Sequence, residues 1–316
     1  MSNKALVAGI SGQTGSLLAK FLLERGFEVT GTSRASGSAD FWRLKRLGIL
    51  DDVELVSLQA DDRNSVCDLL SRKKPNRVYY LAGPSSVGLS FEQPFETFTS
   101  NVIGGLNFLE AIRTLNLDCR FFNAVSTDCF GNQPGVVLDE SSPFKPVSPY
   151  AIAKTASYWN TVGYRDNYGI FASNGILSNH ESPLRGEPFV THKIMTFIRN
   201  FNPKSPTPLR LGNTSIRRDW VWAPEVVEAI FAITEADAPS DYIVATGKSH
   251  SLQDMVEMAA ELSGLSDVLT IESDSSLVRK AEIPSVEVSV DRIEKEVGWK
   301  SSFGLRDLVA GLLEDK

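Results

Sequence analysis

Two short segments carry the residue types best suited to acid–base chemistry. Residues 124–131 read AVSTDCFG, in which Ser126 and Asp128 follow an apolar stretch typical of a buried strand. Further along, SPYAIAK places Tyr150 and Lys154 one helical turn apart, and therefore on one helix face. A free tyrosine has a pKa of about 10, too high for a base at neutral pH. A nearby ammonium stabilises the phenolate, so this pair could take a proton from an alcohol while hydride leaves its carbon.

A glycine-rich segment at the start of the chain predicts a dinucleotide site. VAGISGQTGSLLAKFL places Gly9, Gly12 and Gly15 between a strand pattern and a helix pattern. Glycines in this context permit a tight turn and let the backbone approach a pyrophosphate at the helix N-terminus. We expect Gln13 and Thr14, which lie between these glycines, to belong to the same site.

The next strand pattern indicates which dinucleotide is bound. It ends in GTSRAS, where an NAD site typically has an acidic residue for the ribose hydroxyls. Here the position offers Arg34, with Ser36 beside it and no acid in the segment, which favours the 2′-phosphate of NADP. The alternative is that Arg34 is a solvated surface residue. Four further positions complete the expected cofactor site: Asp61, Asp62, Leu81 and Ala82.

The elements that must position these residues alternate between strand and helix patterns. This alternation predicts an α/β, Rossmann-type doubly wound parallel sheet with helices on both faces. It spans residues 1–178, which we expect to form the NADP-binding domain that carries Tyr150 and Lys154. After residue 178 the pattern becomes irregular. Residues 179–316 are expected to form a smaller substrate-binding lobe with segments that return to the first sheet.

Bulk properties exclude several classes of function. The chain has 316 residues and a net charge of −7, so it has no basic surface for nucleic acid or an anionic membrane. Its three cysteines have no metal-like spacing, and we expect no metal site. Sparse cysteines and an N-terminus without a signal-peptide pattern favour the cytoplasm. No apolar stretch approaches the ~20 residues that span a bilayer.

Across nearly its whole length the chain resembles the extended short-chain dehydrogenase/reductases, and within them most closely the GDP-mannose 4,6-dehydratases. The resemblance is strongest in AGISGQTGSLLAKFLLERG, in RRDWVWAPEVVEAI and in NGILSNHESPLRGEPFVTHKI. It implies that Ser126, Asp128 and Tyr150 are catalytic and that Lys154 supports the tyrosine. It also implies a sugar-nucleotide site made of Ser85, Asn179, Arg185, Glu187, Lys193 and Arg218.

Three departures from the family pattern bear on this comparison. The family usually has Glu at the position of Asp128, and it has Gln-Ser-His where this chain has residues 84–86, PSS. An Arg-Pro dipeptide that helps to hold the nucleotide is replaced by Ile283 and Pro284 in a shortened loop. Aspartate is one methylene shorter than glutamate and reaches about 1.5 Å less. Asp128 could therefore be the expected base, or a residue that only stabilises a turn.

The resemblance implies an NADP-dependent conversion of GDP-mannose into GDP-4-keto-6-deoxymannose by a homodimer or homotetramer. A reductase or epimerase of 4-keto sugar nucleotides is the alternative, because it would need Tyr150 and Lys154 but no carboxylate base. A more distant alternative is a non-catalytic NADP-binding sensor.

Overall fold

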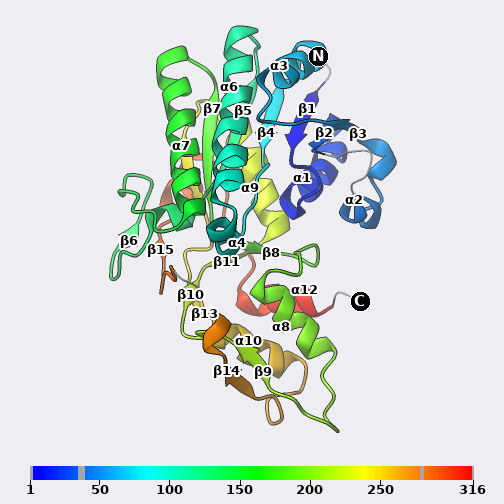
Figure 1. The fold of residues 1–316 in the computed structure, drawn as a ribbon, viewed down its shortest axis with the longest axis vertical. Helices are drawn as coiled ribbons and strands as arrows, with labels where there is room; N and C mark the ends of the chain where they lie inside the picture. Colours follow the sequence, from blue (N-terminus) through cyan, green and yellow to red (C-terminus); the bar gives the residue numbers. More distant parts are fainter. Residues whose placement is uncertain (1–2, 35–39, 278–280, 315–316) are drawn as a thin grey trace.

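A seven-stranded parallel sheet forms the centre of the larger part of the molecule (Figure 1). The computed structural model describes residues 3–34, 40–277 and 281–314. The strand order is β12-β7-β5-β4-β1-β2-β3. These strands are β1 (Lys4–Ala8), β2 (Glu28–Ser33), β3 (Glu54–Ser57), β4 (Arg77–Tyr80), β5 (Arg120–Ser126), β7 (Ala172–Leu177) and β12 (Asp241–Val244). The predicted Rossmann-type sheet is confirmed.

Helices cover both faces of this sheet, as the apolar runs of the strands require. Along β1, Ala5 and Val7 belong to one buried cluster, while Leu6 and Ala8 belong to the cluster on the opposite face. The first face is covered by α1 (Gln13–Leu23), α9 (Ala223–Glu235) and α11 (Asp291–Glu296). The other face is covered by α3 (Arg63–Lys73), α6 (Gly104–Thr114) and α7 (Pro149–Tyr168).

A smaller lobe lies beyond the carboxyl ends of the strands, at the bottom of Figure 1. Its three helices are α8 (Val190–Arg199), α10 (Leu252–Leu262) and α12 (Leu305–Leu313), and they enclose a separate core that includes Ile194, Met255 and Val309. Two small sheets complete the lobe: β9 (Leu209–Leu211) with β14 (Ile271–Ser273), and β10 (Arg217–Arg218) with β13 (His250–Ser251). Three segments of the second half, α9, β12 and α11, return to the large sheet.

The remaining elements are short, and most of them lie between successive strands of the large sheet. They are α2 (Trp42–Arg46), η1 (Leu50–Asp52), α4 (Val87–Glu92), α5 (Pro94–Phe98), η2 (Thr99–Ile103), η3 (Thr127–Phe130), β6 (Val137–Leu138), β8 (Asn179–Glu181), β11 (Trp220–Trp222), η4 (Ser275–Leu277) and β15 (Glu287–Val288). The turn that precedes α6 is a π-helix, where Tyr80 donates a hydrogen bond to the Ser100 carbonyl. Within the described residues, no helix has the length and apolarity needed to cross a membrane.

Candidate active site

The glycine loop between β1 and α1 is built by close backbone contacts. Gly9 has a φ of +87°, and a Cβ there would lie 2.9 Å from the backbone of Ala82. A Cβ on Gly15 would collide with the Gly9 carbonyl. Gly12 is the N-cap of α1 and has no side chain to occupy the first N–H groups of that helix. The loop therefore leaves a concave, N–H-lined surface that suits a pyrophosphate.

Two adjoining cavities run along this loop. One, of about 610 Å³, lies beside the ends of β2 and β3, and the other, of about 250 Å³, lies beside the ends of β5 and β7. Between them they collect most of the predicted cofactor residues: Gly9, Gly12, Gln13, Thr14, Gly15, Arg34, Asp61, Leu81, Ala82, Tyr150 and Lys154. The size and lining of these cavities fit a dinucleotide. No group of three His, Cys, Asp or Glu side chains among the described residues could hold a metal ion.

Among the described residues, the predicted cofactor residue Asp62 lines neither cavity. The Asp62 carboxylate caps α3 instead, where it accepts hydrogen bonds from the Asn64 N–H at 3.0 Å and the Ser65 hydroxyl at 2.5 Å. The hydrogen bond from Ser65 is the main reason that the pKa of Asp62 is lowered. Ser36 lies outside the described residues.

Arg34 lines the larger cavity but is not alone there. Its guanidinium pairs with the carboxylate of Glu96, which α5 brings to the same cavity. The expectation that no acid competes for Arg34 was therefore wrong. That expectation rested on the residues next to Arg34 in sequence, whereas Glu96 is 62 residues away along the chain.

The predicted catalytic residues meet in the smaller of these two cavities. Ser126 ends β5, Asp128 lies in the short helix that follows, and Tyr150 and Lys154 lie in the first turns of α7. The start of α7 is defined by Ser148, whose side chain accepts a hydrogen bond from the Ala151 N–H at 3.1 Å. Pro at the first helical position further favours this start.

Burial dominates the electrostatics of the Tyr–Lys pair. Tyr150 and Lys154 are 7% and 6% exposed. Burial, and then the nearby Asp128 carboxylate, raise the pKa of Tyr150, while a hydrogen bond with Ser126 opposes this effect. Burial lowers the pKa of Lys154 to about 8. Its ammonium donates to the Ala124 carbonyl at 2.7 Å.

The expectation was that Lys154 and a nearby nicotinamide together lower the pKa of Tyr150, and Lys154 by itself does not do so. The lysine Nζ lies 5.9 Å from the centroid of the tyrosine ring, and burial outweighs any influence of its charge. The phenol of the protein alone is therefore protonated at neutral pH.

His180, to which the sequence assigned no role, links the glycine loop to β8. Its Nδ1 lies 2.9 Å from the Ser178 carbonyl, and its Nε2 lies 2.8 Å from the Thr14 hydroxyl. Burial, and then the charge of Arg185, lower the pKa of His180 to about 4. The imidazole is therefore neutral at pH 7, with Nδ1–H donating to Ser178 and Nε2 accepting from Thr14. Gln13 adds a second link through its hydrogen bond to the His180 carbonyl.

Arg43 also went unrecognised in the sequence because no motif surrounds it. It lines the same cavity and donates to the Ser11 carbonyl at 2.9 Å and the Leu184 carbonyl at 2.8 Å. Burial, and then the proximity of Arg185, lower its pKa. Two guanidinium groups thus converge on one cavity, an arrangement that favours an anionic ligand.

A third, small cavity of about 70 Å³ opens beside Asp128 towards the smaller lobe. It collects four of the predicted substrate residues: Ser85, Asn179, Arg185 and Arg218. The Arg185 guanidinium stacks on the Phe189 ring at 3.5 Å and pairs with Glu181 at 3.3 Å. The buried Nε is the atom that makes this ion pair, and within the described part of the chain it has no partner in hydrogen-bond geometry.

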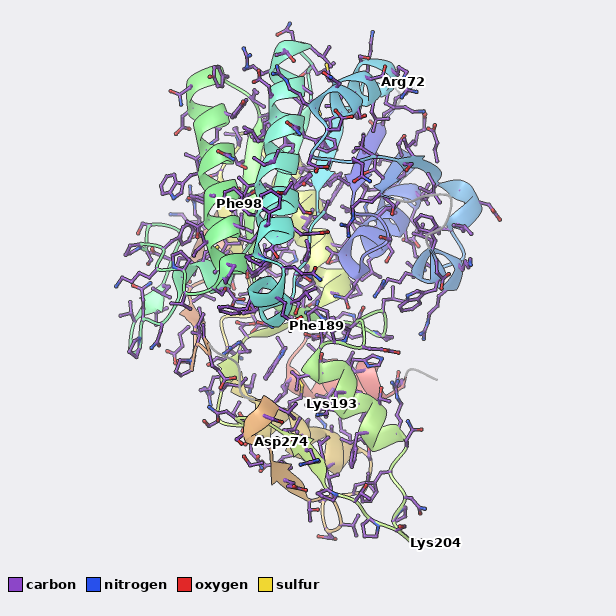
Figure 2. All side chains as sticks on the ribbon, in the orientation of Figure 1. Arg72, Phe98, Phe189, Lys193, Lys204 and Asp274 are labelled. Atoms are coloured by element: carbon purple, nitrogen blue, oxygen red, sulfur yellow. The ribbon has the colours of Figure 1, made fainter. Side chains whose placement is uncertain are left out.

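Lys193 and Glu187 do not line any of these three cavities. Figure 2 places Phe189 at the junction of the two parts and Lys193 further into the smaller lobe. Lys193 is exposed and donates to the Arg210 carbonyl at 2.6 Å, and Glu187 is exposed as well.

The glycine loop, the parallel sheet and the buried Tyr150–Lys154 pair define an extended short-chain dehydrogenase/reductase. Solved structures with this fold include UDP-glucose 4-epimerase from Thermotoga maritima with UDP-glucose, with a TM-score of 0.86 and 21% identity over 99% of this chain and 98% of that one. The Thermus thermophilus UDP-glucose 4-epimerase complex with NAD has a TM-score of 0.83 and 24% identity over 99% and 98% of the chains.

Comparison with sequence relatives identifies the family within the extended short-chain dehydrogenase/reductases. A family profile described as GDP-mannose 4,6 dehydratase matches residues 6–312. GDP-mannose 4,6 dehydratase 1 of Arabidopsis thaliana is 37% identical, over 98% of this chain and 89% of the plant protein. The GDP-mannose 4,6-dehydratase of Vibrio cholerae serotype O1 is 34% identical, over 98% and 92%. The chain belongs to the GDP-mannose 4,6-dehydratase family.

Proposed function

We propose that this protein is a lyase that converts GDP-mannose into GDP-4-keto-6-deoxymannose with bound NADP, a step of deoxysugar biosynthesis. The observation that carries the proposal is the meeting of Ser126, Asp128, Tyr150 and Lys154 at one cavity with the glycine loop, in a member of this family. Fold alone would not support it, because the same scaffold serves many reactions.

Each residue has a distinct part in the proposed reaction. Tyr150 takes the proton of the sugar's C4 hydroxyl as the phenolate, a form that the charges of Lys154 and of a bound, oxidised nicotinamide would favour, and Ser126 donates a hydrogen bond to the C4 oxygen. A bound nicotinamide would supply the redox chemistry by taking hydride from C4 and giving it back at C6. Asp128 removes the C5 proton once C4 is a ketone and passes it to the hydroxide that leaves C6 as water. As hydride returns to C6, Tyr150 releases its proton and C5 takes a proton from solvent. Lys154 holds a positive charge near the phenol.

The order of the proton transfers follows from the charges. Asp128 raises the pKa of Tyr150, so two negative charges at this place disfavour each other. Tyr150 and Asp128 would therefore act in successive steps: Tyr150 is neutralised by the C4 proton before Asp128 takes the C5 proton.

NADP is proposed over NAD because Arg34 lines the adenosine-side cavity. Glu96 works against this preference, since its carboxylate pairs with Arg34 and would repel a 2′-phosphate. We propose that the phosphate displaces Glu96 from Arg34 when the cofactor binds, because a dianionic phosphate attracts the guanidinium more strongly than a carboxylate does.

The diphosphate of the substrate is proposed to lie near Arg185 and Arg218, with Asn179 and Ser85 beside the sugar. A cavity of about 70 Å³ is much smaller than the ~300–1,000 Å³ typical of ligand sites. Substrate entry therefore requires residues 281–283 to move away from Arg218, whose Nη1 now donates to the Ile283 carbonyl at 2.8 Å. In this proposal residues 1–178 serve the cofactor and residues 179–316 mainly serve the sugar nucleotide.

A homodimer or homotetramer in the cytoplasm is proposed for the assembly. Large apolar side chains are exposed on α5 and α7, which pack against each other: Phe95 is 82% exposed, Trp159 59% and Ile152 49%. Apolar side chains gathered in this way are typical of protein–protein contacts.

The alternative, a reductase or epimerase of 4-keto sugar nucleotides, is favoured only by the aspartate at position 128. Incubation of the purified protein with GDP-mannose, followed by mass spectrometry, tests the proposal. Loss of water by wild type, but not by Tyr150→Phe, supports a dehydratase. Unchanged GDP-mannose, together with reduction of a supplied 4-keto sugar nucleotide, would establish the alternative.

A further inference from the structure

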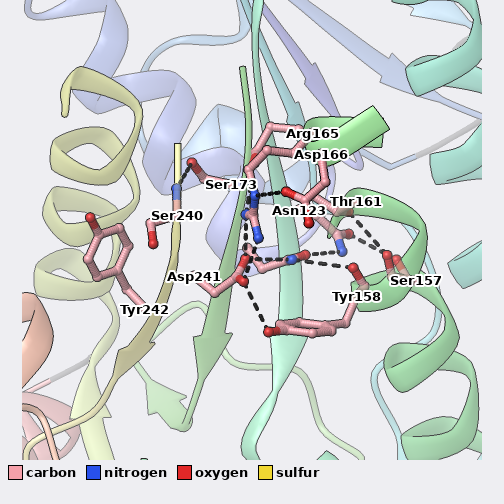
Figure 3. Close-up of polar contacts among 12 residues, drawn as sticks. Asn123, Ser157, Tyr158, Thr161, Arg165, Asp166, Ser173, Ser240, Asp241 and Tyr242 are labelled. Atoms are coloured by element: carbon pink, nitrogen blue, oxygen red, sulfur yellow. Dashed lines mark hydrogen bonds and ion pairs between the residues drawn. The ribbon is translucent and has the colours of Figure 1, made fainter. Parts of the chain in front are cut away.

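A chain of buried polar side chains crosses three strands and begins and ends on α7 (Figure 3). Arg165 binds Asp241 through two hydrogen bonds of 2.8 Å each. Asp241 accepts from the Asn174 amide at 2.8 Å, and Asn174 in turn accepts from the Asn123 amide at 2.8 Å. The Ser157 hydroxyl donates to the Asn123 carbonyl oxygen at 3.1 Å. We call these five residues the strand relay.

Four of the five relay residues are buried, and Arg165 is partly exposed, with a side chain that is 16% exposed. Asn123, Asn174 and Ser157 are 1%, 0% and 3% exposed, and Asp241 is 7% exposed. Buried polar groups require partners, so each amide is held in one orientation, with its NH2 towards the acid and its oxygen towards the donor. A shift of α7 by one residue would break the contact between Ser157 and Asn123 and leave the amide oxygen without a partner.

The spacing of the relay matches the spacing of the active site. Asn123 lies three residues before Ser126 on β5, about 10 Å along a strand. Ser157 lies seven residues after Tyr150 on α7, about 10.5 Å along a helix. Since α7 runs antiparallel to β5, pairing Ser157 with Asn123 brings Tyr150 level with Ser126.

We propose that the strand relay sets the axial position of α7, so that Asn123, Asn174 and Asp241 are positioning residues for Tyr150. The inference rests on the proposed function, in which Tyr150 and Ser126 act on the same oxygen. The first turns of α7 offer few large apolar contacts to specify this position, because their buried residues include Ala151 and Ala153, whose side chains are small. Further along α7, Tyr158 packs in an apolar cluster and also donates to Asp241, at 3.0 Å. A misplacement of about 1 Å at a reacting group can lower the rate on the order of a hundredfold.

Two buried hydroxyls on the same helix provide a matched pair of variants. Ser157→Ala removes one hydrogen bond between α7 and β5 and leaves the other, from Lys154 to the Ala124 carbonyl, in place. Thr161 is buried as well, with 1% of the residue exposed. Its hydroxyl donates within α7, to the Ser157 carbonyl at 3.1 Å, and Thr161→Val removes it. Both substitutions delete one buried hydrogen bond, so a general loss of stability would affect both variants.

The first readout is steady-state kinetics with GDP-mannose. Ser157→Ala is expected to lower kcat by roughly ten- to a hundredfold with little change in KM, because the reacting groups and not the binding groups are displaced. Thr161→Val should keep the kcat of wild type. Wild-type kcat in Ser157→Ala, or equal losses in the two variants, would overturn the proposal.

The second readout does not depend on activity. Amide hydrogen exchange over residues 149–154 should be faster in Ser157→Ala than in wild type and unchanged in Thr161→Val, because only the former weakens the attachment of α7 to β5. Equal exchange in all three proteins would refute the positioning role. If wild type does not convert GDP-mannose, the proposed function fails, and hydrogen exchange alone decides whether the relay positions α7.

Discussion

Lys154 should hold its position at a cost to stability that can be measured. Its pKa falls from 10.5 to about 8 because the ammonium is buried. A shift of about 2.5 units corresponds to ~3 kcal/mol of unfavourable free energy for the charged form at pH 7. The hydrogen bond to the Ala124 carbonyl offsets about 1 kcal/mol of this cost. Lys154→Met, which keeps the shape without the charge, should therefore stabilise the protein by about 2 kcal/mol.

The sign of the pH dependence follows from the same shift. Below pH 8 both the folded and the unfolded chain carry the proton, and the full cost is present. Between pH 8 and about 10.4 the unfolded chain binds more protons than the folded one, so the stability of wild type rises with pH. The advantage of Lys154→Met should therefore be largest at pH 7 and should vanish towards pH 10.

Thermal unfolding without added nucleotide provides the assay. An unfolding entropy of about 0.7 kcal/mol/K for a chain of 316 residues converts 2 kcal/mol into a rise in Tm of roughly 3 °C. The same variant should lose at least about a hundredfold in kcat, because the phenolate is no longer stabilised. Lys145→Met, at an exposed position, serves as the control and should change neither quantity. A Tm for Lys154→Met at or below that of wild type at pH 7 would refute this reasoning.

Three further predictions concern the remaining groups of the site. Asp128→Asn should abolish exchange of the C5 hydrogen with deuterated solvent, and Asp128→Glu should keep it; exchange in Asp128→Asn would show that another group is the base. Arg34→Ala should weaken NADP(H) binding by roughly ten- to a hundredfold and NAD(H) binding much less, whereas Glu96→Gln should tighten NADP(H). Calorimetric titration checks both cofactor variants, and equal losses for the two cofactors in Arg34→Ala would remove its proposed role. Arg218→Ala should weaken GDP binding by roughly ten- to a hundredfold at constant cofactor affinity, and unchanged GDP affinity would contradict its place at the diphosphate.

Local patterns were sufficient to predict the sheet and the centre of the site. The glycine loop and the Tyr150–Lys154 pair depend on spacing within one turn or one helix, so the sequence displays them directly. The helix cap formed by Asp62 is equally local, since the residue immediately precedes a helical pattern, and the sequence could have revealed it. Asp62 was instead assigned, together with Asp61, to the cofactor site.

Non-local contacts could not be read from the chain. Glu96 meets Arg34 only because α5 returns to the end of β2, and Thr14 meets His180 across 166 residues. The strand relay joins three strands that neighbour each other only in the folded sheet. The raised pKa of Tyr150 is likewise a consequence of burial, which residue types alone do not specify.

The central claim is that one active site oxidises C4, removes the C5 proton and reduces C6 of the same sugar. The most direct test supplies GDP-mannose with deuterium at C4, in ordinary water, and locates the label in the product by NMR. The expected result is a 4-keto-6-deoxy product with the C4 deuterium at C6 and a solvent hydrogen at C5. Recovery of GDP-mannose with its label still at C4, or of a product without deuterium at C6, would contradict it.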